Sequence, residues 1–104
     1  MKRMLIRYRT KPECTDENRR LVEDVFRELR EKAPKGVRYA VLKLGEDAFA
    51  HLVEAEDGTN PLTQLEAFQR FVAGVKARCV EPPQSFDADV VGNYGMLDGA
   101  SRRG

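Results

Sequence analysis

The sequence predicts an α+β fold in which four strands and two helices follow one another as β-α-β-β-α-β. Three observations support this prediction. Two stretches of the 104-residue chain carry apolar residues at helical spacing, other short stretches alternate or are rich in β-branched and aromatic residues, and one three-residue turn joins two such stretches. Because crossover connections are right-handed, both helices are expected on one face of a four-stranded antiparallel sheet.

The first strand is predicted for residues 4–9, and Pro12 follows its end. The first helix is expected to begin at Thr15, which stands before two acidic residues as an N-cap residue does. Its apolar stripe has helical spacing and comprises Leu21, Val22, Val25, Phe26 and Leu29. Pro34 and Gly36 end this helix.

A hairpin is predicted next, with strands at residues 37–44 and 48–56. The turn between them, residues 45–47, is short enough to make the two strands antiparallel neighbours. The turn length also predicts the register, which pairs Leu44 with Ala48, Val41 with His51, and Tyr39 with Val53.

The second helix is expected to begin at Asn60-Pro61, with asparagine as the cap and proline in the first turn. Thr63 with Glu66 offers a second start one turn later. The apolar stripe comprises Leu65, Phe68, Phe71, Val72, Val75 and Cys79. Pro82-Pro83 is expected to end the helix, and residues 86–94 are predicted as the last strand.

These elements form the ferredoxin-like arrangement in a single domain over residues 1–97, and the polar residues 98–104 are expected to be a flexible C-terminal tail. Both faces of the predicted sheet are apolar. One face carries Met4, Ile6, Tyr8, Tyr39, Val41, Phe49, His51 and Val53, and the other carries Leu5, Ala40, Leu42, Ala50 and Leu52 together with Arg7, Arg38 and Glu54. Two helices cover only one face, and either set could be the covered one. The uncovered face therefore predicts an interface or a ligand site.

Nucleic acid is one possible occupant of the open face, as in RRM domains, which share this element order. Phe49 and His51 fall where an RRM places its stacking aromatic residues. However, Glu46 and Asp47 stand where a positive charge is expected, and the net charge of the chain is only +1. A nucleic-acid partner is therefore not expected.

The composition also argues against a membrane and against a metal. The chain has no long apolar run and no apolar signal-peptide stretch, so a cytoplasmic protein without a membrane partner is expected. Cys14, Cys79 and a single histidine do not have the spacing of a zinc site, and the two thiols are expected to be reduced.

Four segments carry a family resemblance over roughly residues 3–95: RYRTKP, VEDVFREL, RYAVLKLGEDAFAHLVEAED and NPLTQLEAFQRF. With the element order and the two-sided apolar sheet, they make the chain similar to the dimeric α/β-barrel superfamily, and in particular to small antibiotic-biosynthesis-monooxygenase-like proteins of uncharacterised function. The resemblance implies a homodimer whose two sheets pack as a barrel, a pocket between sheet and helices, and monooxygenase-like oxidoreductase chemistry without a cofactor. Haem-degrading relatives use a tryptophan and a histidine on the second helix. This chain has no tryptophan, so haem is not expected.

The candidate catalytic residues are His51, Tyr39 and Tyr8. His51 would be a general base or a hydrogen-bond donor whose pKa lies near neutrality, and the tyrosines would supply hydroxyls to the same pocket. The alternative is structural: an interface or core histidine with a fixed partner, and tyrosines that cover a sheet.

The candidate substrate-binding residues are Arg7, Arg38 and Phe49, since an arginine can bind a carboxylate or enolate through two parallel hydrogen bonds. Alternatively, the two arginines pair with Glu54 across the sheet. The function expected is a cofactor-independent monooxygenase-like enzyme acting on a small aromatic or quinone-like molecule. A non-catalytic small-molecule-binding or structural dimer is the alternative.

Overall fold

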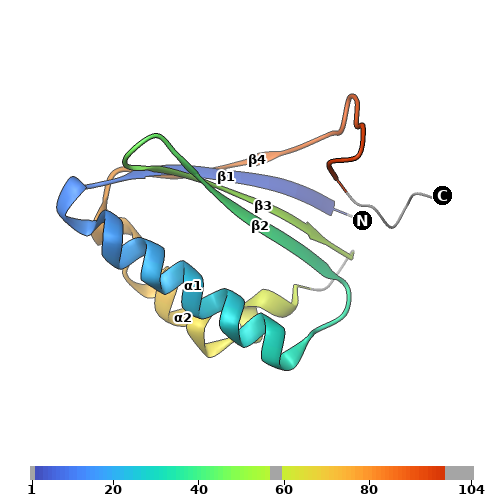
Figure 1. Cartoon of the computed structure of the whole chain (residues 1–104), viewed down its shortest axis with the longest axis horizontal. Coiled ribbons are helices and arrows are strands. Elements are labelled where there is room, and N and C mark those ends of the chain that lie inside the picture. The colour runs from blue at the N-terminus through green and yellow to red at the C-terminus, as the bar shows by residue number, and fades with distance from the viewer. Residues whose placement is uncertain (1, 57–59, 98–104) are drawn as a thin grey trace.

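The computed structural model describes residues 2–56 and 60–97, and it confirms the predicted element order (Figure 1). The main elements are β1 (Lys2–Thr10), α1 (Thr15–Lys32), β2 (Val37–Leu44), β3 (Ala48–Ala55), α2 (Glu66–Ala73) and β4 (Cys79–Asp87). Three short helical segments lie between them: η1 (Pro12–Cys14), η2 (Pro61–Gln64) and α3 (Val75–Arg78). The tail predicted for residues 98–104 lies outside the described residues. In the part of the chain described, no helix is long and apolar enough to cross a membrane.

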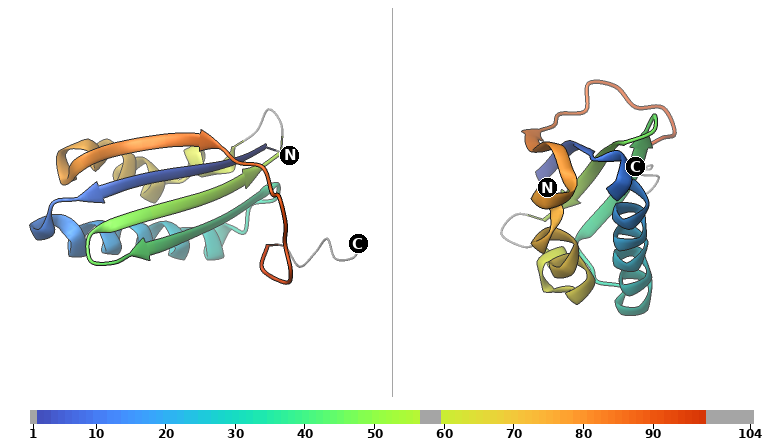
Figure 2. Two further views of the ribbon diagram at one scale, coloured as in Figure 1. Left: turned by 90° about the horizontal axis from the view of Figure 1, so that it is seen from above. Right: turned by 90° about the vertical axis from the view of Figure 1, so that its left-hand side faces the viewer.

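The four strands form one antiparallel sheet in the order β2-β3-β1-β4, which is seen from above in Figure 2. Both long helices lie on one face of this sheet, and the opposite face is open over most of its area (Figure 1). The predicted hairpin register is confirmed at all three pairs, Leu44 with Ala48, Val41 with His51 and Tyr39 with Val53. A three-residue turn leaves little freedom in pairing, which is why the register followed from the sequence.

The face that carries His51 is the one covered by the helices. Phe49 is 2% exposed and His51 is 4% exposed. The buried apolar cluster beneath α1 and α2 comprises Tyr8, Val22, Val25, Phe49, Leu62, Leu65, Ala67, Phe71 and Val75. On the open face, by contrast, Leu42 is 60% exposed and Phe86 is 50% exposed.

The second helical segment is broken, and this corrects its predicted start. The Asn60 side chain accepts a hydrogen bond from the Leu62 amide (3.1 Å) and begins only η2. The helix α2 begins only at Glu66, with Leu65 as its N-cap, so the alternative start capped by Thr63 is also wrong, because Thr63 lies inside η2. Its first amides are bound by Glu28 of α1, whose carboxylate accepts from the Ala67 amide at 2.8 Å. The hydrogen-bonded ion pair with Lys32, together with these backbone hydrogen bonds, holds the pKa of Glu28 below its usual range.

The predicted position of the last strand is wrong. The strand β4 spans Cys79–Asp87, whereas the prediction placed it at residues 86–94, and Cys79 was expected in a helix. Proline at 82 and 83 suggested a chain break between helix and strand. In fact β4 is an edge strand that pairs only with β1, and its register shifts around Arg9. Proline is tolerated at sheet edges and irregularities because fewer backbone N–H groups of such a strand donate to a neighbouring strand.

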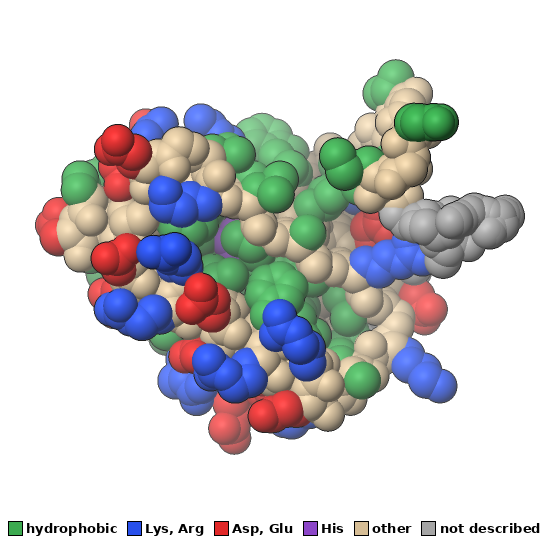
Figure 3. Space-filling view, in the orientation of Figure 1, with side chains coloured by type: hydrophobic (Ala, Val, Ile, Leu, Met, Phe, Trp, Pro, Cys, Tyr) green, Lys and Arg blue, Asp and Glu red, His purple; other side chains and the backbone are tan. Residues whose placement is uncertain are grey.

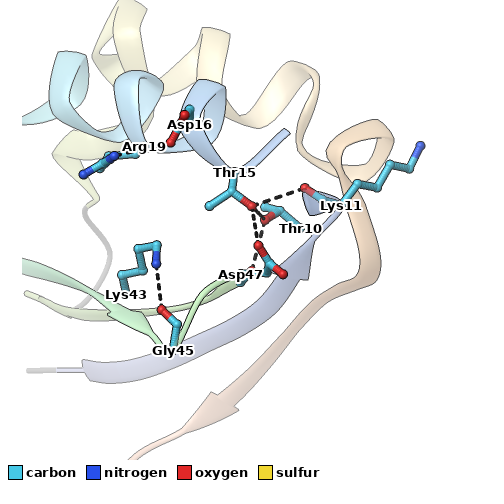
Figure 4. Close-up of polar contacts among 8 residues, drawn as sticks. All are labelled: Thr10, Lys11, Thr15, Asp16, Arg19, Lys43, Gly45 and Asp47. Carbon is cyan, nitrogen blue, oxygen red and sulfur yellow. Dashed lines mark hydrogen bonds and ion pairs between the residues drawn. The ribbon is translucent and has the colours of Figure 1, made fainter. Parts of the chain in front are cut away.

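Thr15 is the first residue of α1 rather than its N-cap, and its hydroxyl serves a different contact (Figure 4). The Thr15 Oγ1 lies 2.8 Å from Thr10 Oγ1 and 2.8 Å from Asp47 Oδ1. Thr10 also donates to the Asp47 carbonyl, from both its amide (2.8 Å) and its hydroxyl (3.0 Å). These bonds tie the hairpin turn to the junction between β1 and α1.

Candidate functional site

Three predicted catalytic residues meet in the layer between the sheet and the helices. Tyr8 on β1, His51 on β3 and Tyr39 on β2 project from the same face of the sheet. The Tyr8 hydroxyl lies 2.8 Å from His51 Nε2, and the Tyr39 hydroxyl lies 2.6 Å from His51 Nδ1. Both ring nitrogens of the histidine are therefore engaged by phenols. The sequence alone placed these residues on one face but did not show that they touch.

The hydrogen bonds continue into the helices through two residues that the sequence analysis did not select. Asn18 of α1 donates from Nδ2 to the Tyr8 hydroxyl at 2.8 Å. Arg78 of α3 donates from Nε to Asn18 Oδ1 at 3.0 Å. Arg78 also donates to the Phe71 carbonyl (2.9 Å), and its guanidinium lies 5.2 Å from the centre of the Phe71 ring. The resulting chain, Arg78–Asn18–Tyr8–His51–Tyr39, is called the relay below.

The helical spacing of Asn18 and Arg78 marks both as positions on a buried stripe. Asn18 lies four residues before Val22 and Arg78 lies three residues after Val75, so both continue a buried stripe. Asn18 is fully buried and Arg78 is nearly so. A polar residue on a buried stripe is informative because burial of a polar group is costly unless it is hydrogen-bonded.

Burial sets the charge state of the relay. It lowers the pKa of His51 from 6.5 to about 4, so the imidazole is neutral at pH 7. Burial also raises the pKa of both tyrosines, Tyr8 and Tyr39, and the Asn18 hydrogen bond opposes this only partly at Tyr8. At pH 7 the histidine and both phenols are therefore uncharged. His51 does not have the pKa near neutrality that the sequence analysis expected of a general base.

A cleft of about 450 Å³ lies between α1 and the β2–β3 hairpin. Its lining has an apolar wall of Val22, Phe26, Val41 and Phe49, and a charged rim of Arg19, Glu23, Arg27, Arg30 and Lys43. Figure 3 shows hydrophobic side chains gathered on this side of the molecule between the sheet and the helix, with basic and acidic side chains around them. The rim carries four cationic groups and one anionic group.

The cleft and the relay share a layer of aromatic side chains. Phe26, which lines the cleft, stacks on Tyr39 with ring centres 5.0 Å apart and planes 7° apart. Phe49, which also lines it, stacks on Tyr8 at 5.5 Å. The cleft therefore borders the two phenols of the relay through one ring each, and small shifts of these rings would change the access to the hydroxyls.

The structure does not bring Arg7 and Arg38 beside the other candidate residues, because both arise from positions that face the open side of the sheet. Arg38 lies 3.7 Å from the buried carboxylate of Glu54, which also contacts Arg3. Arg7 pairs in register with Ala50 and Gln84 instead. The alternative prediction, that Arg7 and Arg38 pair with Glu54, is thus confirmed for Arg38 but not for Arg7. Arg3 is the second arginine that contacts Glu54. Phe49 does line the cleft.

The placement of Phe49 and His51 also corrects the comparison with RRM domains. Stacking residues of that fold lie on the open face, where bases can reach them. Here both side chains are buried under the helices. They cannot serve as a platform on the open face.

Comparison with known proteins supports the fold. No protein-family model and no curated protein matches the chain. Among solved structures, an antibiotic biosynthesis monooxygenase matches with a TM-score of 0.65 and 19% identity, over 88% of this chain and 100% of its own. A candidate antibiotic biosynthesis monooxygenase from Caulobacter crescentus matches with a TM-score of 0.65 and 16% identity, over 86% of this chain and 90% of its own.

A third similar structure is a candidate antibiotic biosynthesis monooxygenase from Nitrosomonas europaea. It has a TM-score of 0.70 and 10% identity, over 90% of this chain and 93% of its own. The chain therefore has the fold of antibiotic biosynthesis monooxygenase-like proteins. At these identities the likeness concerns the fold, and the activity must be argued from the residues of the site.

Proposed function

We propose that this chain is a cofactor-independent monooxygenase-like enzyme that oxidises a small hydroxyaromatic or quinol-like molecule. The observation that carries the proposal is the cleft between α1 and the hairpin, which combines an aromatic wall with a cationic rim. Its position against the buried histidine and tyrosines, and the likeness of the fold to that of antibiotic biosynthesis monooxygenases, support the same class of chemistry.

The lining of the cleft suits a flat molecule with an acidic hydroxyl group. Phe26 and Phe49 line the cleft with aromatic rings, which suit a planar aromatic compound. The rim cations favour the deprotonated form of a bound phenol, since a nearby opposite charge lowers its pKa. Arg19 and Arg27 already pair with Asp16 and Asp24 on the same helix. Arg30 makes no ion pair or hydrogen bond within residues 2–56 and 60–97, which makes it the rim cation best placed to meet a ligand.

The proposed reaction uses O₂ as the oxidant and the substrate as the electron donor, so it needs no further reductant. A deprotonated hydroxyaromatic substrate passes electrons to O₂ from a carbon ortho or para to its oxygen, and a C–O bond forms at that carbon to give a hydroperoxide. Loss of water then leaves a carbonyl, so one oxygen atom enters the product and the other leaves as water with the hydrogen of that carbon and the proton of the hydroxyl group. His51, Tyr39 and Tyr8 are the groups proposed to move protons or to bind the anionic oxygen. The aromatic wall keeps water away from the reacting carbon.

Oxygen uptake with wild-type protein tests this proposal, using a hydroquinone, a naphthol and an anthrone as substrates. Arg30→Glu is expected to lower kcat/KM by roughly tenfold or more, since a hydrogen bond to a charged group contributes about 1.5–3 kcal/mol and about 1.4 kcal/mol is a factor of ten. Arg20→Glu is the matched control, because Arg20 is exposed on the same helix but does not line the cleft. Equal rates for the two variants would place the substrate elsewhere.

A non-catalytic binder is the second candidate, and one observation favours it. Both ring nitrogens of His51 are satisfied inside the protein, and the side chain is almost completely buried. Such a histidine can be structural. Saturable binding of the same three compounds by calorimetry, without oxygen uptake, would identify the chain as a binder.

The open face of the sheet is proposed to be covered by a second copy of the chain. Leu42, Leu44 and Phe86 leave large apolar surfaces exposed there, and such a patch usually marks an interface. Leu42→Asp is therefore expected to convert a dimer into a folded monomer in light scattering at low and high salt. Val72→Asp is the control, because Val72 is an exposed apolar residue on α2, away from this face. A Leu42→Asp variant that remains a dimer would argue against this interface.

A further inference from the structure

The buried relay has only one arrangement of hydrogen atoms that satisfies its most deeply buried groups. Arg78 can only donate, so Asn18 must present its amide oxygen to Arg78 and its NH₂ group to Tyr8. The Tyr8 oxygen therefore already accepts one hydrogen bond. What remains open is whether Tyr8 donates to His51 or accepts a second hydrogen bond from it.

The two possibilities differ in which hydroxyl hydrogen is left without an acceptor. If His51 carried its hydrogen on Nε2, it would donate to Tyr8, and the Tyr8 hydrogen would have no acceptor among the residues described, although Tyr8 is 3% exposed. If His51 carries its hydrogen on Nδ1, Tyr8 donates to Nε2 and Nδ1–H donates to Tyr39. The hydrogen left over then belongs to Tyr39, which is only half-buried. An unpaired donor is more costly at the more buried position.

We infer that Asn18 and Arg78 are positioning residues that hold His51 as the Nδ1–H tautomer and so leave the Tyr39 hydroxyl as the donor at the end of the relay. All hydrogen bonds then run in one direction, from the Arg78 guanidinium to the Tyr39 oxygen. Each bond polarises the next, so the positive charge of Arg78 strengthens the donor at the far end. No carboxylate neutralises that charge within the part of the chain described.

The direction of the relay determines what Tyr39 can offer to a ligand. Tyr39 does not itself line the cleft, and the Phe26 ring, which does, stacks on it. A shift of that ring would expose the Tyr39 O–H to an acceptor, such as the phenolate or carbonyl oxygen of a hydroxyaromatic molecule. With the relay in this direction, His51 does not act as a base toward the cleft. Instead, the hydrogen bond from His51 Nδ1–H makes the Tyr39 O–H a stronger donor. That O–H would stabilise an anionic oxygen, as donors in an oxyanion hole do. This use of the relay rests on the proposed function, whereas the tautomer itself does not.

The tautomer can be measured directly, because the chain contains a single histidine. A long-range ¹H–¹⁵N correlation spectrum of uniformly ¹⁵N-labelled, ligand-free protein at pH 7 distinguishes a protonated ring nitrogen from an unprotonated one. The expected result for wild type is Nδ1–H with Nε2 unprotonated. An Nε2–H spectrum for wild type would overturn the inference, whatever the protein does with oxygen.

Asn18→Asp is the most informative variant, because it replaces the side-chain NH₂ group by an oxygen and hardly changes the volume of the side chain. The new carboxylate accepts from both Arg78 and Tyr8, so the Tyr8 hydrogen turns away from His51. His51 Nε2–H then donates to Tyr8, and Tyr39 donates to Nδ1, so the spectrum is expected to switch to the Nε2–H tautomer. Gln64→Glu makes the same change of charge at an exposed position and is expected to keep Nδ1–H. An Asn18→Asp variant that folds and keeps Nδ1–H would refute the role of Asn18.

The spectrum tests the His51 tautomer, and oxygen uptake tests the proposed function, so either one can be wrong without the other. If the tautomer is as inferred but no compound is oxidised, the proposed function is wrong and the positioning role stands. If Asn18→Asp does not fold, the wild-type spectrum alone decides the assignment.

Discussion

Phe49→Ala is expected to lower the free energy of unfolding by about 3–5 kcal/mol, measured by chemical denaturation at pH 7. Phe49 is 2% exposed and stacks on Tyr8 at the centre of the layer between sheet and helices. Removing a buried phenylalanine loses its transfer free energy and leaves a cavity, which together give this range. A domain of this size is stabilised by about 5–15 kcal/mol in total, so the variant is expected to be marginally folded.

Tyr94→Ala is the matched control for this variant, because the Tyr94 side chain is 100% exposed. It removes an aromatic ring of similar size and is expected to change stability by less than about 0.5 kcal/mol, as surface substitutions do. If Phe49→Ala unfolded at the same denaturant concentration as Tyr94→Ala, the assignment of the helix-covered face would be incorrect.

Acid is expected to destabilise the protein through His51 alone before the carboxylates contribute. The folded-state pKa of His51, about 4, is lower than its ordinary value of 6.5. Between these values the unfolded chain binds a proton that the folded protein does not, so stability falls as the pH falls. At about 1.36 kcal/mol for each pKa unit, the full loss is about 3 kcal/mol, and about 2 kcal/mol of it is lost between pH 7 and pH 5.

His51→Gln separates this effect from other titrations. Glutamine can donate to one tyrosine and accept from the other, but it does not titrate. Denaturation at pH 7, 6 and 5 is expected to show a falling stability for wild type and a nearly flat profile for the variant. Carboxylates ordinarily titrate near pH 4 and contribute little in this range. A wild-type profile as flat as that of His51→Gln would mean that His51 is accessible to protons in the folded state.

The sequence predicted most of the fold, because its elements are encoded locally. The stripe of α1 and the short turn between β2 and β3 left few alternatives, and the hairpin register followed at every tested pair. The last strand was misplaced because prolines such as Pro82 and Pro83 occur both at the end of a helix and in an irregular edge strand. Only the pairing of β4 with β1 distinguishes the two cases, and that pairing is not local.

The site was less predictable, because it depends on which face of the sheet the helices cover. Tyr8, Tyr39 and His51 were correctly placed on one face by alternation. Arg7 and Arg38 were assigned to the same site on chemical grounds alone, although alternation placed them on the opposite face. The cleft is formed by Phe26 and Arg30 of α1 against the hairpin, and the orientation of a helix over a sheet is a tertiary property that periodicity does not contain.

Pro82 and Pro83 also restrict how copies of this chain can meet. In an extended strand, one of two consecutive residues directs its nitrogen toward the neighbouring strand and the other directs it outward. A proline pair in β4 therefore removes a donor from the outer border of the sheet as well as from the ladder with β1. That border is a poor template for another strand, so the sheet resists growth into a continuous, fibril-like ribbon. The proposed pairing of two copies over the open face, by contrast, stops at two partners.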